Sequence, residues 1–575
     1  MTERISILNA FFLTLAASPV LPSGLPSTSG ELMIWETLRR EIVAQRPFDV
    51  AVVGAGQAGC TLAGKIAEKG VHPSTGEPLR IAVFDRGPYL KGASHPGYGS
   101  PERRRMFTNV STDFVGRYAQ WTGMPSGAVR KIPIQPGEEI FLQRAPAIFG
   151  GGTLHYTART RAPFDIDMQV WEEETGADWG PAVLKPFGEQ VHRDFNIHVR
   201  PPETLCRLDH LVRDNALSSG YELSDFPIAK RNCLLSGYCD GVNMCRYDAR
   251  QGSFVAYLPL AEERGAEMVA NAAVERILLE PSQGQVKVTG LEYLQDGVRK
   301  TMAVPNVIVS AGNYGTPPLL YRSGYGPREL TDNLVVENRN VGRNTDNRPE
   351  AFGPVGIFDE PVSDGAFRHG NAYYVYHDLD SSRRYDRLAI SIWARQIPYP
   401  DRVAMDPLAP EFGRDHKKFM DGISEPGRMT RAQADITRQC ITKLELVRPR
   451  NIRGWINEWG EQFYPGHDPR IIQAMEQGRE VVYELLKKMG AREVVGMDRP
   501  IRVHHLEAFV GACRVGTDRS NSVVNPYFES HDVEGLFICD GSVVPRAASQ
   551  GYAGTVATLA LLAASRIVQR HFSRG

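Results

Sequence analysis

The most regular pattern of apolar and polar positions lies between residues 48 and 85. Residues 48–53 are almost continuously apolar, which is typical of a strand buried in a parallel sheet. Small and apolar residues then recur at helical spacing from Ala58 to Lys69, and Gly70 marks the expected end of this helix. A second apolar run at 80–84 predicts another strand. The order strand, helix, strand predicts a βαβ unit.

Later segments carry weaker versions of the same patterns. Tryptophans and acidic residues alternate over 165–196, which predicts a helical segment at the surface. Strand-like pieces at 372–377, 388–393 and 441–447 lie in a region of weak periodicity, from about 347 to 500, and predict a second domain that contacts substrate. The other predicted elements are helices at 256–264, 471–489 and 555–570, a meander with strands at 267–279, 285–294 and 300–309, and a buried strand at 536–539.

Composition narrows the class of protein only modestly. The 575 residues suffice for two or three folding units, and 42% hydrophobic and 23% charged residues are ordinary for a globular protein. A net charge of −1 argues against nucleic acid as a partner. Eight cysteines are too few for a disulfide scaffold in a chain of this length.

The N-terminus contains an apolar run at 5–17, which is too short to span a bilayer. The residues before it are not clearly basic, so a packed N-terminal helix is favoured over a signal sequence. The expected location is therefore cytoplasmic, with export as the alternative.

Three glycines follow the first strand as G-x-G-x-x-G, with Gln57 and Ala58 between the second and the third. In a dinucleotide-binding turn, the first glycine (Gly54) permits the tight turn and the second (Gly56) lets backbone approach a pyrophosphate. The third, Gly59, lets helix and strand pack closely. Because the helix N-terminus then faces the phosphate charge, this order predicts a dinucleotide site.

Asp85 ends the second strand, where a carboxylate is placed to accept a hydrogen bond from a ribose hydroxyl. The distance in sequence from Gly59 is longer than usual, and a polar insertion at 72–78 accounts for it. Arg86 follows and would tolerate a 2′-phosphate, so this stretch alone does not exclude NADP.

Two further stretches carry candidate chemistry. The triple glycine at 150–152 lets backbone approach a ligand closely, and His155 follows it. Cys233, Cys239 and Cys245 are equally spaced, but this spacing matches neither a C-x-x-C site nor a ferredoxin pattern. We therefore expect a packed loop there and no metal site.

These pieces, in this order, resemble the glucose–methanol–choline (GMC) flavoprotein oxidoreductases, and the resemblance covers nearly the whole chain after residue 46. It rests on the glycine turn with Asp85 and on later motifs. These motifs are Ser310-Ala-Gly312 with Thr316-Pro-Pro-Leu-Leu320, Val341-Gly-Arg-Asn344, Gly511-Ala-Cys-Arg-Val-Gly516, Asn521-Ser-Val-Val-Asn-Pro526 and Asp540-Gly-Ser-Val-Val-Pro545. The segments at 151–156 and 516–518 are most similar to the gluconate dehydrogenase and pyranose oxidase branch.

The resemblance implies FAD rather than NAD. The residues that match the FAD site of the family are Gly54, Gly56, Gln57, Ala58, Gly59, Asp85 and Arg86 for the ADP half, Val274 for the adenine, Gly151, Gly152 and Gly312 along the cofactor, Asp540 and Gly541 for the ribityl and pyrophosphate region, and Thr555 for the flavin pyrimidine. His155 matches the position of a covalent flavin link in pyranose oxidase, whereas the gluconate branch has a histidine there without needing the link. Covalent and non-covalent FAD both stay open.

The family also implies an α/β fold, with a Rossmann-like, three-layer β/β/α FAD-binding domain and an α+β substrate-binding domain on an antiparallel sheet. The expected division is an N-terminal extension at 1–45, FAD-binding segments at 46–165, 226–346 and 501–575, and substrate-binding segments at 166–225 and 347–500, with the active-site loop in the last FAD-binding segment.

The largest departure from the family concerns proton transfer. The family places its catalytic histidine three residues before the glycine of the motif that here begins at Gly511, and an asparagine or histidine partner shortly after the Asp540 motif. In this chain these positions are Ala508 and Gly551, and neither side chain moves a proton.

Three interpretations follow. His505 or His504 replaces the base, with Gln550 or Tyr552 as its partner, because a histidine with a near-neutral pKa suits this task. Alternatively, the pocket is emptied for a bulky substrate and the base lies elsewhere. In the third interpretation, the enzyme is redox-silent, or it uses flavin for chemistry without alcohol deprotonation.

We therefore expect an FAD-dependent oxidoreductase that oxidises a CH–OH group of a sugar, glycoside or secondary metabolite by hydride transfer to flavin N5. The alternative is a flavin-binding relative with lyase or light-driven decarboxylase chemistry. The expected partner is a small-molecule substrate, with oxygen, a quinone or a cytochrome as the electron acceptor.

Overall fold

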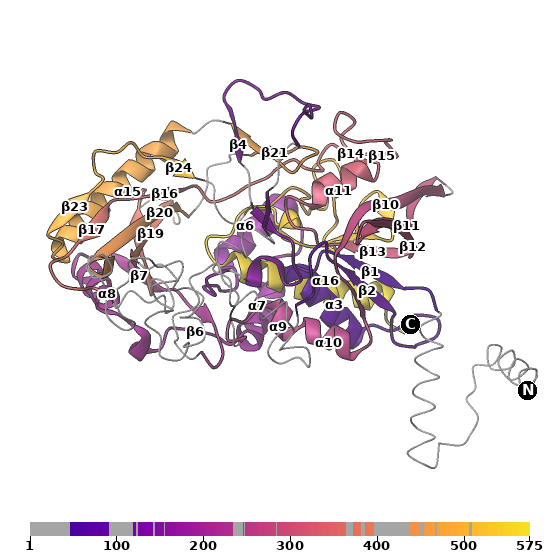
Figure 1. Ribbon diagram of the computed structural model, residues 1–575, viewed down its shortest axis with the longest axis horizontal. Helices are drawn as coiled ribbons and strands as arrows, with labels where there is room; N and C mark the ends of the chain where they lie inside the picture. Colours follow the sequence, from indigo (N-terminus) through magenta and orange to yellow (C-terminus); the bar gives the residue numbers. More distant parts are fainter. Residues whose placement is uncertain are drawn as a thin grey trace, which may run out of the picture. The chain divides into compact units, whose positions relative to one another are not determined.

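We analysed a computed structural model of the chain (Figure 1). It describes residues 46–90, 119–121, 125–141, 144–154, 156–233, 245, 248–282, 284–363, 372–380, 386–395, 436–447, 453–465, 468–504 and 509–574. Residues 1–47 form one unit and Phe48–Gly575 the other, and every element below belongs to the second. The apolar run at 5–17 lies outside the described residues.

A five-stranded parallel sheet organises the N-terminal and C-terminal ends of this unit. Its order is β26-β13-β1-β2-β9, formed by Leu536–Ile538, Asn306–Val309, Val50–Val53, Ile81–Phe84 and Glu267–Val269. All four pairs are parallel, and the register sets Val53 opposite both Phe84 and Val309. The residues that follow these strands therefore emerge at one edge of the sheet.

Helices and a second sheet cover the two faces of the parallel sheet. On one face α3 (Gln57–Lys69) packs against β1 and β2 and lies beside α16 (Tyr552–His571). On the other face lies an antiparallel meander of β10 (Ala272–Ser282), β11 (Gln285–Gln295) and β12 (Val298–Ala303), which contacts β2 and β13. This three-layer arrangement confirms the predicted α/β class (Figure 1).

The meander prediction was wrong in its first and last strands. The sequence pattern joined 267–279 into one strand, but Glu267–Val269 pairs in the parallel sheet as β9 and the meander begins at Ala272 with β10. The pattern also joined 300–309 into one strand, but the chain leaves the meander after Ala303 and enters the parallel sheet as β13. Pro305 lies between the two strands, and because proline has no N–H to donate to a ladder, it separates them.

An antiparallel sheet forms the second core, as the periodicity at 372–377, 388–393 and 441–447 predicted. Its order is β23-β17-β20-β19-β18-β7, with β16 pairing both β20 and β24. In the order in which they are named here, these strands are Glu493–Val495, Val355–Ile357, Gln439–Leu446, Arg387–Ala394, Tyr373–Asp378, Glu222–Asp225, Glu350–Phe352 and Val503–His504. The helices α8 (Arg207–Ser218) and α15 (Pro469–Lys488) pack on it.

The segment at 165–196 is helical, as predicted, but its tryptophans are not at the surface. It forms α6 (Asp165–Thr175) and α7 (Pro181–Asp194), with Trp171 1% and Trp179 0% exposed. Trp179 stacks on Phe528 with ring centroids 5.0 Å apart. The large apolar area of each indole favours burial, which outweighs the polar character of its neighbours.

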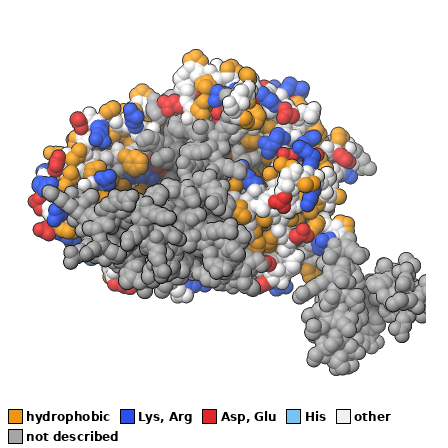
Figure 2. Space-filling model, viewed as in Figure 1, with side chains coloured by type: hydrophobic (Ala, Val, Ile, Leu, Met, Phe, Trp, Pro, Cys, Tyr) orange, Lys and Arg blue, Asp and Glu red, His pale blue; other side chains and the backbone are white. Residues whose placement is uncertain are grey.

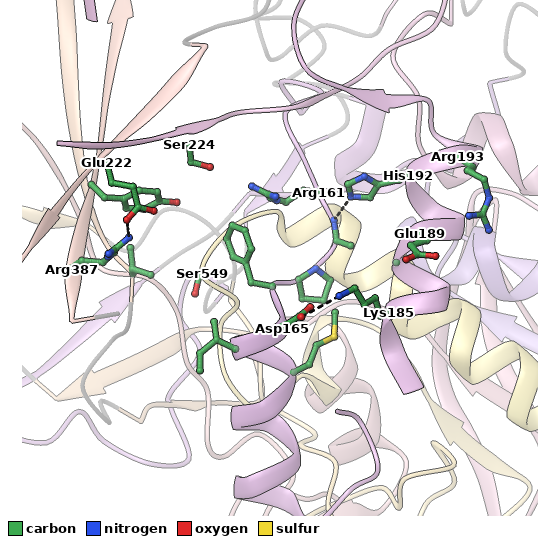
Figure 3. Close-up of a pocket in the computed structure, with 18 residues that line it drawn as sticks. Arg161, Asp165, Lys185, Glu189, His192, Arg193, Glu222, Ser224, Arg387 and Ser549 are labelled. Atoms are coloured by element: carbon green, nitrogen blue, oxygen red, sulfur yellow. Dashed lines mark hydrogen bonds and ion pairs between the residues drawn. The ribbon is translucent and has the colours of Figure 1, made fainter. Parts of the chain in front are cut away.

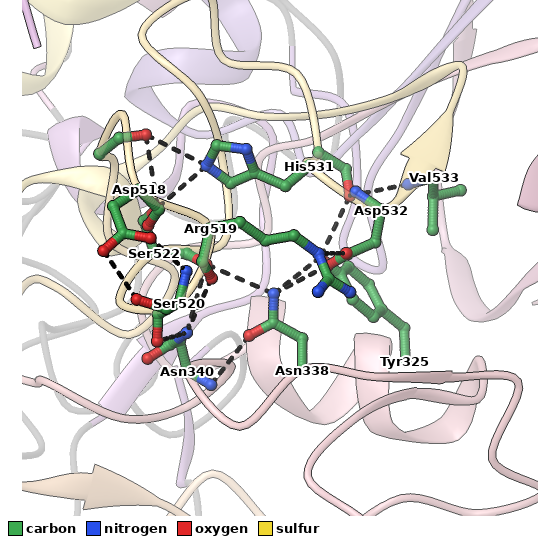
Figure 4. Close-up of polar contacts among 12 residues, drawn as sticks. Tyr325, Asn338, Asn340, Asp518, Arg519, Ser520, Ser522, His531, Asp532 and Val533 are labelled. Carbon is green, nitrogen blue, oxygen red and sulfur yellow. Dashed lines mark hydrogen bonds and ion pairs between the residues drawn. The ribbon is translucent and has the colours of Figure 1, made fainter. Parts of the chain in front are cut away.

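A polar cluster fixes the loop between Gly516 and Val533 (Figure 4). The buried carboxylate of Asp532 accepts hydrogen bonds from the hydroxyl of Tyr325 at 2.9 Å and from Nδ2 of Asn338 at 2.8 Å, and Arg519 pairs with it. Because each donor comes from a different segment, this carboxylate ties the C-terminal motifs to the chain near β14 (Tyr325–Gly326).

The described surface has no dominant sign of charge in the view of Figure 2, where basic and acidic side chains are interspersed. None of the described helices is both long enough and apolar enough to cross a bilayer.

We expect Trp179→Ala to lower the free energy of unfolding by about 3–5 kcal/mol, because a fully buried indole leaves a cavity. Thermal unfolding would show a lower Tm. Trp459→Ala is the matched control, since Trp459 is 36% exposed, and it should change Tm little. Equal shifts in the two variants would contradict the packing role of Trp179.

Candidate functional site

The glycine turn between β1 and α3 is shaped by close backbone contacts. Gly54 has a φ of +97°, and a Cβ there would lie 2.4 Å from the carbonyl oxygen of Ser310. A Cβ on Gly59 would lie 1.8 Å from the carbonyl oxygen of Gly54. Gly56 has no neighbouring atom within 4 Å of such a Cβ. Packing therefore requires two of the three glycines, while the third leaves an open space beside the turn.

Gln57 and Ala58 begin α3, and their side chains serve the protein itself. Nε2 of Gln57 donates to the carbonyl of Ala553 at 3.1 Å, and its Oε1 accepts from the N–H of Ser253 at 3.0 Å. Ala58 is buried in the core. A ligand can therefore bind only to the backbone of these two residues, which lie in the first helical turn, where N–H groups lack helical partners.

Asp85 follows β2 and faces the glycine turn. Its carboxylate accepts the N–H of Ala55 at 3.1 Å and that of Gly87 at 2.9 Å. Burial raises its pKa, and these two hydrogen bonds oppose the rise. The carbonyls of Asp85 and Gly87 accept the N–H groups of Ala272 and Asn271, which places the start of β10, with Val274, beside this carboxylate. Arg86 is exposed.

The triple glycine packs on the same turn. The N–H of Gly150 donates to the carbonyl of Ala55 at 2.6 Å, and a Cβ on Gly151 would lie 3.0 Å from Cα of Gly56. Gly152 has open space where its Cβ would be. Two glycine faces without neighbours thus flank one gap. His155 lies outside the described residues, so its covalent link to FAD stays a hypothesis.

Asp540 follows β26 and is the most heavily hydrogen-bonded group of the site. One carboxylate oxygen accepts the N–H of Gly312 at 2.8 Å and the hydroxyl of Thr316 at 2.6 Å, and the other accepts the N–H of Ser542 at 2.7 Å. Burial raises the pKa of Asp540, and these bonds counteract the rise. Gly312 has a φ of +80° and nothing within 4 Å of a Cβ, so it presents a bare face.

Asp85 and Asp540 are joined by continuous contacts along one edge of the sheet. Asp85 binds Ala55, and the neighbouring Gly54 packs on Ser310 and Ala311. Gly312 follows these and binds Asp540. The arrangement follows from the parallel register, because all of these residues come directly after strands that end at one level.

The N-terminus of α16 points to a ligand beyond the protein. Thr555 lies in its first turn and is 0% exposed, yet its hydroxyl has no hydrogen-bond partner among the described residues. Asn313 shows the same feature: its Oδ1 accepts the N–H of Ala512 at 3.1 Å, whereas no described atom bonds its Nδ2. An unsatisfied buried polar group costs about 1–3 kcal/mol, which a bound ligand would offset. Asn313 was missed from the sequence, although it directly follows a strand-end glycine.

Four features of this edge fit a dinucleotide cofactor. They are the bare glycine faces, the two strand-end carboxylates, the two helix N-termini and the two buried polar atoms without a partner among the described residues. The fold and this site define a dinucleotide-binding protein of the Rossmann-like type.

Comparison with known proteins identifies the family. The GMC oxidoreductase family matches residues 48–350 with its N-terminal part and residues 463–560 with its C-terminal part. The chain belongs to the GMC oxidoreductase family; it is an FAD-dependent oxidoreductase, and its cofactor is FAD. The gluconate dehydrogenase and pyranose oxidase branch stays a prediction.

Several relatives resemble almost the entire chain. It is 23% identical over 558 residues to the long-chain-alcohol oxidase FAO3 of Arabidopsis thaliana, covering 91% of this chain and 68% of the relative. It is 24% identical over 331 residues to the oxygen-dependent choline dehydrogenase of Vibrio vulnificus, covering 54% and 53%. The solved structure of pyridoxine 4-oxidase from Mesorbium loti superimposes with a TM-score of 0.64 at 16% identity, covering 91% of this chain and all of that one, which shows a shared fold.

The segment 346–350 contacts both stretches that depart from the family pattern, the one near Ala508 and the one near Gly551. The backbones of Asp346 and Val510 exchange hydrogen bonds at 2.9 and 3.0 Å. The side chain of Arg348 donates to the carbonyl of Ser549 at 2.8 Å, and Glu350 pairs with His504 across β16 and β24. The described chain therefore brings the two ends of 504–509 and the residues before α16 together. His505 and Ala508, like the side chain of His504, lie outside the described residues.

Gly551 has a structural reason to be glycine. Its φ is +72°, and a Cβ there would lie 2.3 Å from the carbonyl oxygen of Arg161. No proton-handling side chain fits at this position unless Arg161 moves. The close packing at the first turn of α16 therefore explains why glycine, rather than a larger side chain, stands at 551.

The two candidate partner residues beside Gly551 differ. The hydroxyl of Tyr552 donates to the carbonyl of Phe509 at 3.2 Å. Gln550 is 1% exposed, and its Nε2 donates to the hydroxyl of Tyr376, which reaches it from β18. Its Oε1 is buried and has no partner in the part of the chain that the structure describes. Of the two, Gln550 retains an unused acceptor. Tyr376 was missed because its sequence context is that of an ordinary strand residue.

A buried ionic network lies under the segment at 346–350. Lys443 contacts Glu350 at 2.9 Å and Glu445 at 3.0 Å, and Arg348 lies 3.4 Å from Glu445. Burial by itself would raise the pKa of Glu445, but Lys443 and Arg348 outweigh it and hold the pKa at about 2. Glu445 therefore stays charged at neutral pH.

The predicted cysteine loop is only partly visible, because Cys239 lies outside the described residues. In the described ranges, no three His, Cys, Asp or Glu side chains are placed to hold a metal ion.

We expect Gly56→Val to fold normally and to lose bound FAD, because the added side chain meets no protein atom and enters the gap beside the turn. The measurement is the ratio of flavin to protein absorbance after purification, with far-ultraviolet circular dichroism as the check on folding. Lys69→Val, at the exposed end of the same helix, is the control. Full FAD content in Gly56→Val would place the pyrophosphate elsewhere.

We expect Gly551→Asn, which restores the residue type of the family, to destabilise the protein by about 1–3 kcal/mol, because the new Cβ overlaps the carbonyl of Arg161. Gly297→Asn is the matched control, since Gly297 has a φ of +82° but open space around its Cβ. Differential scanning calorimetry should show a lower Tm for Gly551→Asn alone. A Tm equal to that of the control would refute the steric argument.

Proposed function

We propose that this protein oxidises the CH–OH group of an alcohol to a carbonyl, with FAD supplying the hydride acceptor. One observation carries the proposal. Gln550 and Thr555, five residues apart, both keep a buried polar oxygen without a partner among the described residues. Thr555 lies on the side of the glycine turn and Gln550 on the side of the antiparallel sheet. The segment thus serves a cofactor at one end and a substrate at the other.

The substrate hydroxyl would donate its hydrogen bond to Oε1 of Gln550. Tyr376 fixes the amide by accepting from Nε2, and this leaves Oε1 as the available acceptor. The proton leaves to a histidine, His505 or His504, because both ends of their segment are anchored beside Gln550 and Tyr552. The remaining FAD contacts are those proposed from the sequence, with Asp540 orienting Gly312 rather than reaching a ligand itself.

The substrate is a small molecule, and the sugar, glycoside or secondary-metabolite class expected from the sequence is one part of a wider range. Two relatives are named for their substrates as a long-chain-alcohol oxidase and a choline dehydrogenase. A protein of the same fold is named as a pyridoxine 4-oxidase. Oxygen, a quinone or a cytochrome would accept the electrons.

A second candidate function is lyase or light-driven decarboxylase chemistry on the same flavin. The observation that favours it is the contact between Gly551 and Arg161, which leaves no room for the proton-handling partner of the family. The two candidates differ in one respect, because only the first requires an alcohol to reduce the flavin.

We expect His505→Ala to slow anaerobic reduction of the flavin by alcohol about 10²- to 10⁴-fold, the usual contribution of a general base. Stopped-flow absorbance measures the rate, with His504→Ala run in parallel and His72→Ala as a control on the surface turn. FAD content should not change. A normal rate in His505→Ala with a slow rate in His504→Ala would assign the base to His504. If no alcohol or sugar reduces the flavin of the unmodified enzyme, the second candidate replaces the first.

A further inference from the structure

A cavity of about 720 Å³ lies between α6, α7 and the antiparallel sheet (Figure 3). Its volume is in the range of small-molecule sites. Apolar and hydroxyl-bearing side chains form much of its lining. These include Pro163, Phe164, Met168, Tyr376, Val447 and Ser549.

Arg161 is one of the charged side chains of this lining. Its guanidinium lies over the ring of Phe164, 4.1 Å from the centroid, and Figure 3 shows it between Ser224 and His192. Within the described residues it makes no ion pair and no side-chain hydrogen bond. Burial lowers the pKa of Arg161, because removal from water disfavours the charged form. Arg161 is half-buried, and a partly desolvated cation without a counter-ion interacts more strongly with an anion than one in water.

The other basic groups around the cavity are paired with a carboxylate, exposed, or already hydrogen-bonded. Arg387 binds Glu222 and Asp378, each at 2.9 Å, and Lys185 lies 3.2 Å from Asp165. Arg193 is exposed. His192 accepts the N–H of Ala162 through Nε2 at 3.0 Å, so that nitrogen carries no proton.

The acidic groups do not neutralise Arg161 by contact either. Asp167 is buried nearby, but its carboxylate accepts hydrogen bonds from Phe164 at 3.1 Å and from the N–H and hydroxyl of Ser549 at 3.0 and 2.7 Å. The carboxylates of Asp165 and Glu222 are exposed at the rim and paired. An anion that entered the cavity would therefore meet one unpaired guanidinium beside hydroxyl donors.

The cavity adjoins the proposed reaction site. The carbonyl of Arg161 packs on Gly551 and Gly554 in the first turn of α16, and Ser549 and Tyr376 line the cavity on either side of Gln550. Gln550 itself does not line the cavity, so a ligand there lies against Ser549 and Tyr376, the two residues that adjoin Gln550.

We propose that Arg161 binds the carboxylate of the substrate, so that the enzyme acts on hydroxy acids; this inference rests on the proposed alcohol oxidation. The planar guanidinium matches a carboxylate through two parallel hydrogen bonds. A single positive charge balances a carboxylate, whereas a phosphate carries more negative charge than one guanidinium balances. The cavity holds the acid end of the substrate, and its hydroxyl end lies at Gln550.

The test is a calorimetric titration of the FAD-loaded enzyme with three matched pairs, each a hydroxy acid and its methyl ester. The acids are 6-hydroxyhexanoate, 12-hydroxydodecanoate and 4-(hydroxymethyl)benzoate. The variants are Arg161→Gln, which keeps hydrogen-bonding groups without charge, and Arg161→Lys, which keeps charge without the planar fork. Lys185→Gln is the matched control, because it removes a cavity cation that is already paired and exposed.

The unmodified enzyme should bind at least one acid more tightly than its ester, and Arg161→Gln should weaken binding of that acid about 10- to 100-fold while leaving the ester unchanged. Arg161→Lys should fall between these values, and Lys185→Gln should match the unmodified enzyme. The proposal is overturned if no acid is preferred to its ester, or if Arg161→Gln, folded by its Tm and FAD content, keeps the preference. If Arg161→Gln does not fold, Arg161→Lys decides, and a preference for the acid equal to that of the unmodified enzyme overturns the proposal.

Anaerobic titration of the flavin with the preferred acid separates this inference from the proposed function. An acid that binds through Arg161 and reduces the flavin supports both. An acid that binds through Arg161 but never reduces the flavin supports the carboxylate site and contradicts alcohol oxidation.

Discussion

The buried carboxylate of Asp540 is the interaction on which the cofactor edge of the sheet depends. It accepts hydrogen bonds from the backbone of Gly312 and Ser542 and from the hydroxyl of Thr316, so three segments that are distant in sequence are fixed to one group. A carboxylate is costly to bury, and these charge-assisted bonds are what make its burial tolerable. Because its oxygens are occupied in this way, Asp540 fixes the backbone of Gly312, whose bare face we propose to meet the cofactor. The neighbouring strands place Asp85 and the glycine turn along the same edge.

A second constraint is the contact between the carbonyl of Arg161 and the first turn of α16. It demands glycine at 551 and at 554, which leaves no room for the proton-handling partner that the resemblance to the family places at 551. Under the proposed function Gln550, one residue earlier, takes the polar role, and Tyr376, which hydrogen-bonds to it, comes from the other sheet. The site therefore depends on how the two cores meet, and on the segment at 346–350 that hydrogen-bonds to both active-site stretches.

Sequence periodicity predicted the elements whose signals are local. The strands at β1, β2 and β26 and the helices α3, α15 and α16 appear where apolar spacing indicated them, and the roles of Gly54 and Gly59 follow from the steric demands of one short turn. Features that depend on long-range packing were missed. Pro305 divides an apolar run between two sheets, Trp179 is buried by a partner 349 residues away in the chain (528 − 179), and Tyr376 resembles any strand tyrosine until Gln550 is seen beside it.

The pairing of buried charges elsewhere in the molecule gives Arg161 its significance. Lys443 and Arg348 are buried, and both contact Glu445, whose pKa they hold at about 2. Arg200, also buried, lies 3.2 Å from Asp209. The chain thus places an acid against these cations when it encloses them, in keeping with the cost of an isolated charge. Arg161 is half-buried on the wall of a cavity and has no such carboxylate among the described residues, and under our proposal the substrate supplies one.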